Sequence, residues 1–581
     1  MKDIKVKKRI RESSHQLGSV FNDDPILNSI LCARGVSSSD ELDLSIKGLL
    51  HPNQMAGLQE AAKVLQDAIV KCEKILIVGD FDVDGATSTA LMLRVLKKFG
   101  VERVDYLVPN RFNYGYGLSP EFVEFAAKKK SPELIITVDN GISSLEGVSI
   151  ARGLNIKVLI TDHHLPGEIV PDADAILNPV LDKKNHKYKN LAGVGVAFYL
   201  LAQTRILLTK CGWFDQNRIK PPKLSSYLDL VALGTIADLV PLDCNNRRLV
   251  FNGLRLIKAK LGNPGIIALA NVSGKSLSFV NESDLAFSIA PKINAAGRLA
   301  DMSIGIECLI SDDYSYCTSL AESLNEINQR RKKVEEKIQE EALKIAADIT
   351  GKFKKDQIPS GFALFGTGWH QGVSGIVASR VKEAFNRPVI VFANDKEGVL
   401  KGSARSVTGV HIRDVLSYVN STWPGIIIQF GGHAMAAGLS IRSNDLKDFG
   451  NRFNIALSRL YGKSYFDEVL YTDGELTEGQ YGITFFKKLE ELGPWGNGFP
   501  EPKFDGKFDI IDQKLLSGGH IRMVLKPLGM EATVEAIAFG AKDSAWVKSA
   551  KSFFGVFRLQ VNRFRNVEKA QLVMDKIIEF T

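Results

Sequence analysis

Three aspartates at alternate positions, Asp80, Asp82 and Asp84, follow an apolar run that begins at Ile75, in the segment ILIVGDFDVDG. Carboxylates held about 4 to 5 Å apart repel each other by roughly 3 to 4 kcal/mol per pair at a protein-like dielectric. Such a cluster is typical of a cation site, because bound cations remove the repulsion. The alternative, a solvated acidic turn, is disfavoured because further acids and two histidines recur in similar settings along the chain.

An EF-hand calcium loop begins with the same pattern, Asp-x-Asp-x-Asp-Gly, with Gly85 at the sixth position. The twelfth position of this chain is Leu91, where that loop requires a bidentate glutamate. The run from Ile75 to Val78 also predicts a buried parallel strand and not a helix. We therefore reject the EF-hand and expect a strand, an acidic loop and a helix from Ala86 to Phe99.

Two later apolar runs also end in side chains that bind metals. Leu134 to Val138 is followed by Asp139, and Lys157 to Thr161 is followed by Asp-His-His, which contains His163 and His164. Strands that alternate with helical patterns predict a doubly wound parallel sheet, in which ligands bind outside the carboxyl ends of the strands. We therefore expect three strands to deliver these acids and histidines to one edge.

Three more residues of the first half are candidates. Asp238 is the only late acid of an apolar helical stretch from Tyr227 to Leu239, where a simple cap of the next turn is an alternative. Arg298 lies in IAPKINAAGRL, where we expect a glycine-flanked turn. Arg111 lies in the loop PNRFNYGYGLSP, whose composition fits an anion contact and an ordinary aromatic turn equally well.

A second α/β block follows a long helical pattern that predicts a connector between two domains. Within this block we expect small-residue turns at TGWHQGVSG, GSARS and GGHAMAAG, which contain Ser403, Arg405, Gly432 and His433. Glycines let a phosphate approach backbone N–H groups, and arginine supplies a bidentate fork. These turns therefore favour a phosphate-binding function.

Short alternating strands after about residue 470 predict a small β-barrel. Basic and aromatic residues alternate along them, for example Phe504, Phe557, Arg558 and Arg563. Such a pattern is typical of surfaces that stack bases and follow a phosphate backbone, although we expect about half of the aromatics to form the barrel core.

Bulk properties agree with a globular protein that has a polyanionic partner. The chain has 581 residues, 45% apolar content and a formal net charge of +8, although the proposed site concentrates acids. Its six cysteines form no CxxC pair, which disfavours a zinc site or a disulfide framework and favours reduced core residues. No apolar run reaches the length of a membrane span and no export signal is visible, so we expect a cytoplasmic protein without membrane contact.

We expect five parts along the chain: an N-terminal arm (1–50), a first α/β domain (51–310), a connector helix (311–352), a second α/β domain (353–456) and a barrel (457–581).

The segments GDFDVDG, TVDNG, TDHH and ADLVPL resemble the successive motifs of the DHH phosphoesterase superfamily. WHQGVSGIVASR, KGSARS and FGGHAMAAG resemble its associated second domain, and the barrel resembles an OB-fold. The order of parts is similar to that of the single-strand-specific 5′ to 3′ DNA exonucleases of this superfamily, from about residue 50 to the end. Two departures are Phe81, where a tyrosine is common, and Ala404, where a glycine is common.

The resemblance implies two divalent cations, and the ligand chemistry of carboxylates with one imidazole suits Mn²⁺ or Mg²⁺ better than Zn²⁺. It implies Asp82 and Asp139, with Asp80, for one ion and Asp84, Asp139, His163 and Asp238 for the other. His164 would lie beside the scissile phosphate and assist charge stabilisation or proton transfer. Arg111, Arg298, Ser403, Arg405, Gly432 and His433 would bind the substrate, and most of them would grip its 5′ phosphate.

The implied function is a nuclease that releases 5′-mononucleotides from single-stranded DNA in repair and recombination, with a single-strand-binding protein and a helicase as candidate partners. A second hypothesis is a DHH-type hydrolase of short oligonucleotides or cyclic dinucleotides, which the barrel disfavours because a small substrate needs no extended surface. A third is a replication scaffold without activity, which the complete set of acids and histidines disfavours.

Overall fold

The computed structural model describes residues 4–9, 24–110, 114–115, 117–351, 358–395, 398–462, 468–564 and 567–581. The chain forms two compact units. The smaller unit comprises Met1–Lys7 and Glu326–Leu470, and the larger unit comprises Lys8–Asn325 and Tyr471–Thr581.

A five-stranded parallel sheet forms the centre of the first α/β domain, as the sequence predicts. Its strands lie in the order β3-β2-β4-β5-β6, and every neighbouring pair is parallel. The bounds are β2 Ile75–Gly79, β3 Val104–Leu107, β4 Leu134–Val138, β5 Lys157–Thr161 and β6 Ala175–Leu177. The central strands β2 and β4 are buried along their whole length, which explains why they are continuous apolar runs.

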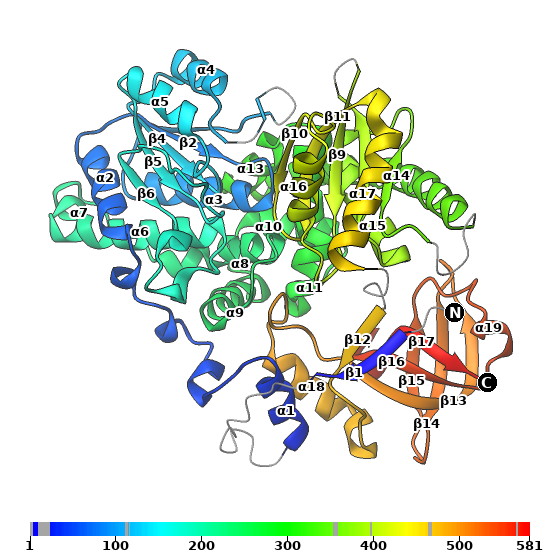
Figure 1. The fold of residues 1–581 in the computed structure, drawn as a ribbon. Helices are drawn as coiled ribbons and strands as arrows, with labels where there is room; N and C mark the ends of the chain where they lie inside the picture. Colours follow the sequence, from blue (N-terminus) through cyan, green and yellow to red (C-terminus); the bar gives the residue numbers. More distant parts are fainter. Residues whose placement is uncertain are drawn as a thin grey trace. The chain divides into compact units, whose positions relative to one another are not determined.

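Helices cover both faces of this sheet (Figure 1). On one face Leu76, Val78, Ile135 and Val158 pack against α4 Pro120–Lys130 and α5 Leu145–Gly153. The alternate residues pack on the other face with α2 Leu58–Val70, α3 Val83–Lys98 and α6 Gly193–Lys210. The alternation follows from the two-residue period of a strand, and the burial fixes the register of the sheet.

The helix after the first strand begins earlier than the sequence suggested. It starts at Val83 and not at Ala86, because Asp82 serves as its N-cap and accepts a hydrogen bond of 3.0 Å from the Gly85 backbone N–H. The three aspartates therefore do not share a loop. Asp80 follows the strand, Asp82 caps the helix and Asp84 lies in its first turn.

The rest of this domain is helical, and one of its helices corrects an expectation. Arg298 lies in the last turn of α12 Ala290–Leu299 and not in a glycine-flanked turn. The remaining helices are α1 Pro25–Ala33, α7 Trp213–Gln216, α8 Leu228–Ala237, α9 Cys244–Lys258, α10 Pro264–Val272, α11 Glu282–Asp284 and α13 Ser303–Ile310, with a π-helical segment at Leu285–Ile289.

The C-terminal part of the larger unit is a closed barrel, as predicted, with the strand order β13-β14-β15-β17-β16. The bounds are β13 Phe504–Leu515, β14 Ile521–Pro527, β15 Val534–Ala538, β16 Ser552–Phe564 and β17 Val567–Phe580, with α18 Ile483–Leu492 before the barrel and α19 Trp546–Ser549 within it. Only the pair of β15 and β17 is parallel among the described strand pairs of the barrel.

The smaller unit contains a second sheet, in the order β10-β11-β9-β8-β7. The bounds are β7 Phe362–Phe365, α15 Gln371–Phe385, β8 Val389–Asn394, β9 Val399–Arg405, α16 Ile412–Thr422, β10 Gln429–Gly432, β11 Ala436–Arg442 and α17 Leu446–Tyr461. The predicted connector is the single helix α14 Tyr314–Gly351, and the division between the two units falls within it. Strands β1 Ile4–Lys8 and β12 Glu468–Thr472 form a separate two-stranded sheet.

Two of the expected turns in this unit are strands instead. The first four residues of GSARS, up to Arg405, end β9, and GGHAMAAG is the end of β10, a short connection and the start of β11. The small residues reflect close packing, because a Cβ on Gly402 would lie only 2.6 Å from the ring of Phe392.

The cysteines are all free, but they are not all core residues as expected. Cys308 and Cys317 are buried, whereas Cys72 and Cys211 are exposed. Within the described ranges, none of the helices has both the length and the apolar character that crossing a membrane requires.

Candidate metal centre

The carboxyl ends of three neighbouring strands bring the predicted acids and histidines together. Asp80 follows β2, Asp139 follows β4, and His163 and His164 follow β5 by two and three residues. The pairing of β2 with β4 and of β4 with β5 places these ends at the same edge of the sheet. The structure therefore confirms that one sheet edge carries these side chains.

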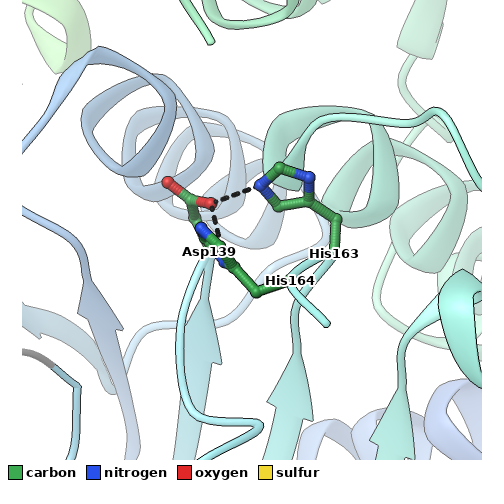
Figure 2. Close-up of side chains that lie close together, drawn as sticks. All are labelled: Asp139, His163 and His164. Carbon is green, nitrogen blue, oxygen red and sulfur yellow. Dashed lines mark ion pairs between the residues drawn. The ribbon is translucent and has the colours of Figure 1, made fainter. Parts of the chain in front are cut away.

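His163 lies at the centre of the cluster. Its Nε2 atom is 3.0 Å from Oδ1 of Asp139, 3.5 Å from Oδ2 of Asp238 and 3.9 Å from Oδ2 of Asp84. Figure 2 shows the imidazole of His163 directed at the Asp139 carboxylate, with His164 approaching the same carboxylate. One ring nitrogen thus meets carboxylates from three separate elements.

The candidate ligand atoms fall into overlapping groups. Ligand atoms of Asp80, Asp82 and Asp139 lie within 4.8 Å of one another, and so do those of Asp84, His163 and Asp238. A third such group joins Asp139 to His163 and His164, so Asp139 connects the sets. All six residues predicted as ligands are therefore in one place, with oxygen and imidazole donors that fit hard divalent cations.

Asp84 is held in place by the N-terminus of α6. Its Oδ2 accepts a hydrogen bond of 2.6 Å from the backbone N–H of Gly193, and its Oδ1 accepts one of 2.9 Å from Val194. The N-terminal N–H groups of a helix favour a negative charge. Each carboxylate oxygen keeps a second lone pair, so these hydrogen bonds still allow a cation to bind.

Burial and mutual repulsion raise the pKa values of the carboxyl groups. Burial raises the pKa of Asp84 to about 7, and the charge of Asp82 contributes. Burial raises the pKa of Asp238 to about 9, with repulsion from Asp84 and Asp82. The pKa of Asp139 lies well above its usual range because of burial and the charge of Asp84. The ionised forms of these carboxylates are therefore destabilised when no cation is bound. A bound cation would stabilise them.

The two histidines have opposite protonation behaviour. Burial and the charge of His164 lower the pKa of His163 to about 4, so this imidazole is neutral at pH 7, the form that binds metals. Burial alone would lower the pKa of His164, but the hydrogen bond to Asp162 and the charge of Asp162 outweigh it and raise the pKa to about 9.

Asp162 is a residue that the sequence did not single out. Its Oδ1 lies 2.8 Å from Nδ1 of His164 and accepts hydrogen bonds from the backbone N–H groups of His163 and His164. Its Oδ2 accepts a hydrogen bond of 2.9 Å from the backbone N–H of Ile142. Asp162 thus orients both histidines and fixes the loop after β4. The position of Asp162 directly before the two histidines is the sequence feature that could have indicated this role.

Gly193 is a second residue that the sequence did not reveal. Asp139 adopts a left-handed backbone conformation with φ +63°, and its Cβ lies beside the first residue of α6. A Cβ on Gly193 would lie 2.6 Å from Cβ of Asp139 and 2.9 Å from its Cα. Only a glycine therefore allows the first turn of α6 to approach Asp139 this closely.

The predicted substrate-binding residues of the first domain have different outcomes. Arg111 lies outside the described residues. Arg298 follows Gly297, whose Cα is so close to the Phe81 carbonyl group that a Cβ there would collide with it. The backbone of α12 beside Arg298 therefore packs against the segment between Asp80 and Asp82, and a substrate contact of Arg298 stays a prediction.

The candidates of the smaller unit lie on two strands of its sheet. Ser403 and Arg405 point to the same face of β9, away from α16 and α17, because the intervening Ala404 packs into the core with those helices. Arg405 is largely buried, its Nη1 donates to the Ala404 carbonyl, and burial lowers its pKa. Gly432 ends β10, and the backbone N–H of His433 donates to the Ala436 carbonyl across a tight connection.

The barrel aromatics that the sequence singled out form its core. Phe504 and Phe557 are both completely buried. Arg558 forms ion pairs with Glu501 and Asp575, and Arg563 with two further glutamates. These four side chains therefore have structural contacts, and a strand-binding surface of the barrel stays a prediction.

Three family models match the chain in sequence order. The model described as DHH family, N-terminal domain, matches residues 74–235. The DHHA1 domain matches residues 359–458, and the RecJ OB domain matches residues 472–576.

Curated relatives resemble nearly the whole chain. The chain is 45% identical over 575 residues to the single-stranded-DNA-specific exonuclease RecJ of Haemophilus influenzae. The aligned region covers 98% of this chain and 99% of that protein. It is 44% identical over 554 residues to the RecJ of Escherichia coli, with 95% of this chain and 96% of that protein covered.

Two solved structures share the fold. A crystal structure of RecJ from Thermus thermophilus in complex with Mn²⁺ has a TM-score of 0.78 at 28% identity and covers 99% of this chain and 79% of that chain. The corresponding Mg²⁺ complex has a TM-score of 0.74 at 26% identity, with coverage of 99% and 78%.

Proposed function

The chain belongs to the RecJ family within the DHH superfamily, and on this premise we propose that it is a metal-dependent exonuclease specific for single-stranded DNA. The observation that supports this most is the convergence of five carboxylates and His163 at one sheet edge. At finer detail, the proposal is digestion from 5′ to 3′ with release of 5′-mononucleotides, in DNA repair and recombination.

The donor set fits Mn²⁺ or Mg²⁺, which are the ions present in the similar solved structures. Asp80, Asp82 and Asp139 would hold one ion, and Asp84, Asp139, His163 and Asp238 would hold the other. A pair of such ions supplies an activated water and stabilises the attacking and leaving oxygens of an in-line displacement at phosphorus.

His164 acts on the scissile phosphate in this proposal. Its Nδ1 is engaged by Asp162, and its raised pKa keeps the ring protonated near neutral pH. A protonated imidazole can stabilise charge on a phosphate oxygen or donate a proton to the leaving oxygen.

Further residues would contact the substrate in this proposal. In the smaller unit Ser403, Arg405, Gly432 and His433 would bind the 5′-terminal phosphate through backbone N–H groups and the guanidinium. Arg111 and Arg298 of the first domain would also contact the substrate. The proposal also includes two α/β domains at 51–310 and 353–456 and a nucleic-acid-binding barrel at 457–581. It places the protein in the cytoplasm. Its proposed partners are a single-strand-binding protein and a helicase.

Asp139→Ala tests the function and the site together. Asp139 joins the ligand groups, so the variant should lose Mn²⁺ binding and hydrolysis of single-stranded DNA while keeping its fold. Asp172→Ala is a matched control, because Asp172 is an exposed carboxylate of the same domain that pairs with Arg152. Substantial metal-dependent activity in Asp139→Ala would contradict the site.

The products of digestion identify the substrate and the direction in which the strand is digested. Single-stranded and double-stranded DNA, labelled at either end, would be digested with Mn²⁺, Mg²⁺ or a chelator. We expect mononucleotides from the 5′ end of single strands only. Cleavage restricted to dinucleotides would favour the alternative hydrolase of short oligonucleotides or cyclic dinucleotides.

A further inference from the structure

A tight turn before the barrel forms hydrogen bonds with the segment that directly follows Asp238. In the turn Gly496 to Phe499, the backbone N–H of each end residue donates to the carbonyl of the other, at 2.9 and 3.1 Å. Asn497 is at its tip. The Nδ2 atom of Asn497 donates a hydrogen bond of 2.6 Å to the Leu239 carbonyl, and its own backbone carbonyl accepts one of 2.7 Å from the Leu242 N–H.

The two glycines of the turn allow this approach. A Cβ on Gly496 would lie 2.7 Å from Cδ1 of Leu242, and a Cβ on Gly498 would lie 3.2 Å from Cβ of Pro241. Gly498 also has φ +72°, a conformation that side chains disfavour. The turn is therefore shaped to fit the segment from Leu239 to Leu242.

The segment that follows Asp238 contains a backbone conformation that must be stabilised by other contacts, because it is unfavourable for Leu239. Helix α8 ends at Ala237 and Asp238 is its C-cap. Leu239 follows with φ +60°, a left-handed conformation that glycine most often adopts at this position. The Leu239 side chain is exposed, so packing does not hold this conformation. The hydrogen bond from Asn497 to the Leu239 carbonyl, together with the bond of 3.4 Å from the Leu239 N–H to the Ile236 carbonyl, holds the backbone immediately after the candidate ligand Asp238.

The turn itself is rigidly anchored. Trp495 stacks on Phe499, with ring centroids 5.1 Å apart. Arg34 lies over Trp495 on one side, and Arg247 lies over Phe499 on the other. The side chain of Arg34 is completely buried and pairs with Asp473, so this stack joins the N-terminal arm, α9 and the approach to the barrel.

We infer that the turn Gly496–Phe499 is a positioning element for Asp238, and that Asn497 is the residue through which the barrel segment sets the affinity of one of the two metal positions. In this role Asn497 acts through the Leu239 backbone and not as a metal ligand. Because Asp238 groups with Asp84 and His163, and not with Asp80 and Asp82, the effect is confined to one ion. The inference rests on the proposed metal-dependent function.

The test is a Mn²⁺ titration of the full-length protein without DNA, followed by calorimetry and by the electron paramagnetic resonance signal of free Mn²⁺. Asn497→Ala removes the donor, and Asn497→Asp keeps the shape but replaces the donor with an acceptor. We expect one of two Mn²⁺ ions to bind about tenfold more weakly in both variants, as for other groups that orient metal ligands. The other ion should bind as in the wild type, and exonuclease activity should recover at high Mn²⁺ concentration.

Glu282→Ala is the matched control. Glu282 accepts a hydrogen bond of 2.9 Å from the Trp495 backbone N–H, so its loss loosens the same linker without touching residues 239–242. Wild-type Mn²⁺ affinity in Asn497→Ala or Asn497→Asp would overturn the inference, and so would an equal loss in Glu282→Ala. Asn497→Ser, which keeps a donor, should lie between the wild type and Asn497→Ala, and thermal unfolding would exclude a general loss of fold.

The outcomes separate this inference from the proposed function. A wild-type protein that binds two Mn²⁺ ions but does not digest single-stranded DNA would contradict the proposed function alone, and the titration would still decide the role of Asn497. A wild-type protein that binds no Mn²⁺ would overturn both.

Discussion

The Nδ1 atom of His164 lies 2.8 Å from Oδ1 of Asp162, and this contact favours the protonated form of the imidazole. The imidazole would be neutral if burial alone acted on it. The buried Asp162 carboxylate outweighs burial and raises the pKa of His164 to about 9. The first aspartate of the Asp-His-His segment is thus a hydrogen-bond partner of the third residue.

Asp162→Asn should therefore lower the pKa of His164. In the metal-free protein, an NMR titration of the imidazole should move from about 9 toward the ordinary histidine range, because the neutral amide no longer attracts the proton. With Mn²⁺, the rate on single-stranded DNA should fall by about 10²-fold, a typical contribution of a positioned acid or base. Asp182→Asn, at an exposed turn of the same domain, should change neither. An unchanged His164 titration in Asp162→Asn would contradict this assignment.

Gly193→Ala should damage the site without damaging the helix. Gly193 is the first residue of α6, and alanine is at least as compatible with a helix as glycine. Here the added Cβ would lie 2.6 Å from Cβ of Asp139 and must displace that carboxylate. A misplacement on the order of 1 Å can lower a rate by about 10²-fold. Gly153→Ala in α5, where a Cβ would meet nothing within 4 Å, is the control for thermal unfolding and exonuclease rate. Equal rates in the two variants would show that Asp139 tolerates the shift.

The strands and their chemistry were predictable from the sequence because they are local. A buried parallel strand reads as an apolar run, and the residues after it must lie at the carboxyl edge of the sheet. The convergence of Asp80, Asp139 and His163 follows from three such segments.

The supporting contacts could not be predicted, because they join residues that are far apart in the chain. Asp84 and Gly193 are separated by 109 positions, and Asn497 and Leu239 by 258. Local patterns also predicted the wrong backbone structure at two positions. Asp82 reads as a candidate ligand in a loop, although it also caps α3. The small residues of GSARS read as a turn, although Gly402 is small because Phe392 packs against it.

The metal-free protein should lose stability as the pH rises. The pKa values of Asp84 and Asp238 are raised to about 7 and about 9 by burial, against about 3.9 for an unfolded aspartate. The raised pKa of His164 acts in the same direction. Between about pH 6.5 and 9 the native state therefore holds more protons than the unfolded state, and unfolding free energy falls with pH.

Mn²⁺ should reverse this trend, because it replaces the protons. We expect the melting temperature with chelator to fall from about pH 6.5 to 9, and the increase on adding Mn²⁺ to become larger over the same range. Asp139→Ala, which lacks the shared ligand, should show a much smaller Mn²⁺ effect. A Mn²⁺ effect on melting temperature that is independent of pH would contradict the coupling of these carboxylates to a cation.

Arg405→Ala should weaken the binding of substrates with a 5′ phosphate far more than those without one. The guanidinium is largely buried on β9 beside the N-terminal turns of α15, where a Cβ on Gly375 would lie 2.7 Å from its Nη2. A charge-assisted hydrogen bond contributes about 1.5 to 3 kcal/mol, so KM for 5′-phosphorylated single strands should rise by about 10- to 100-fold. Arg405→Lys should recover only part, because an ammonium lacks the planar fork. Arg413→Ala is the control, since Arg413 is exposed on α16, which covers the opposite face of the sheet. If Arg405→Ala raised KM equally for 5′-phosphorylated and 5′-hydroxyl strands, Arg405 would not bind the terminal phosphate.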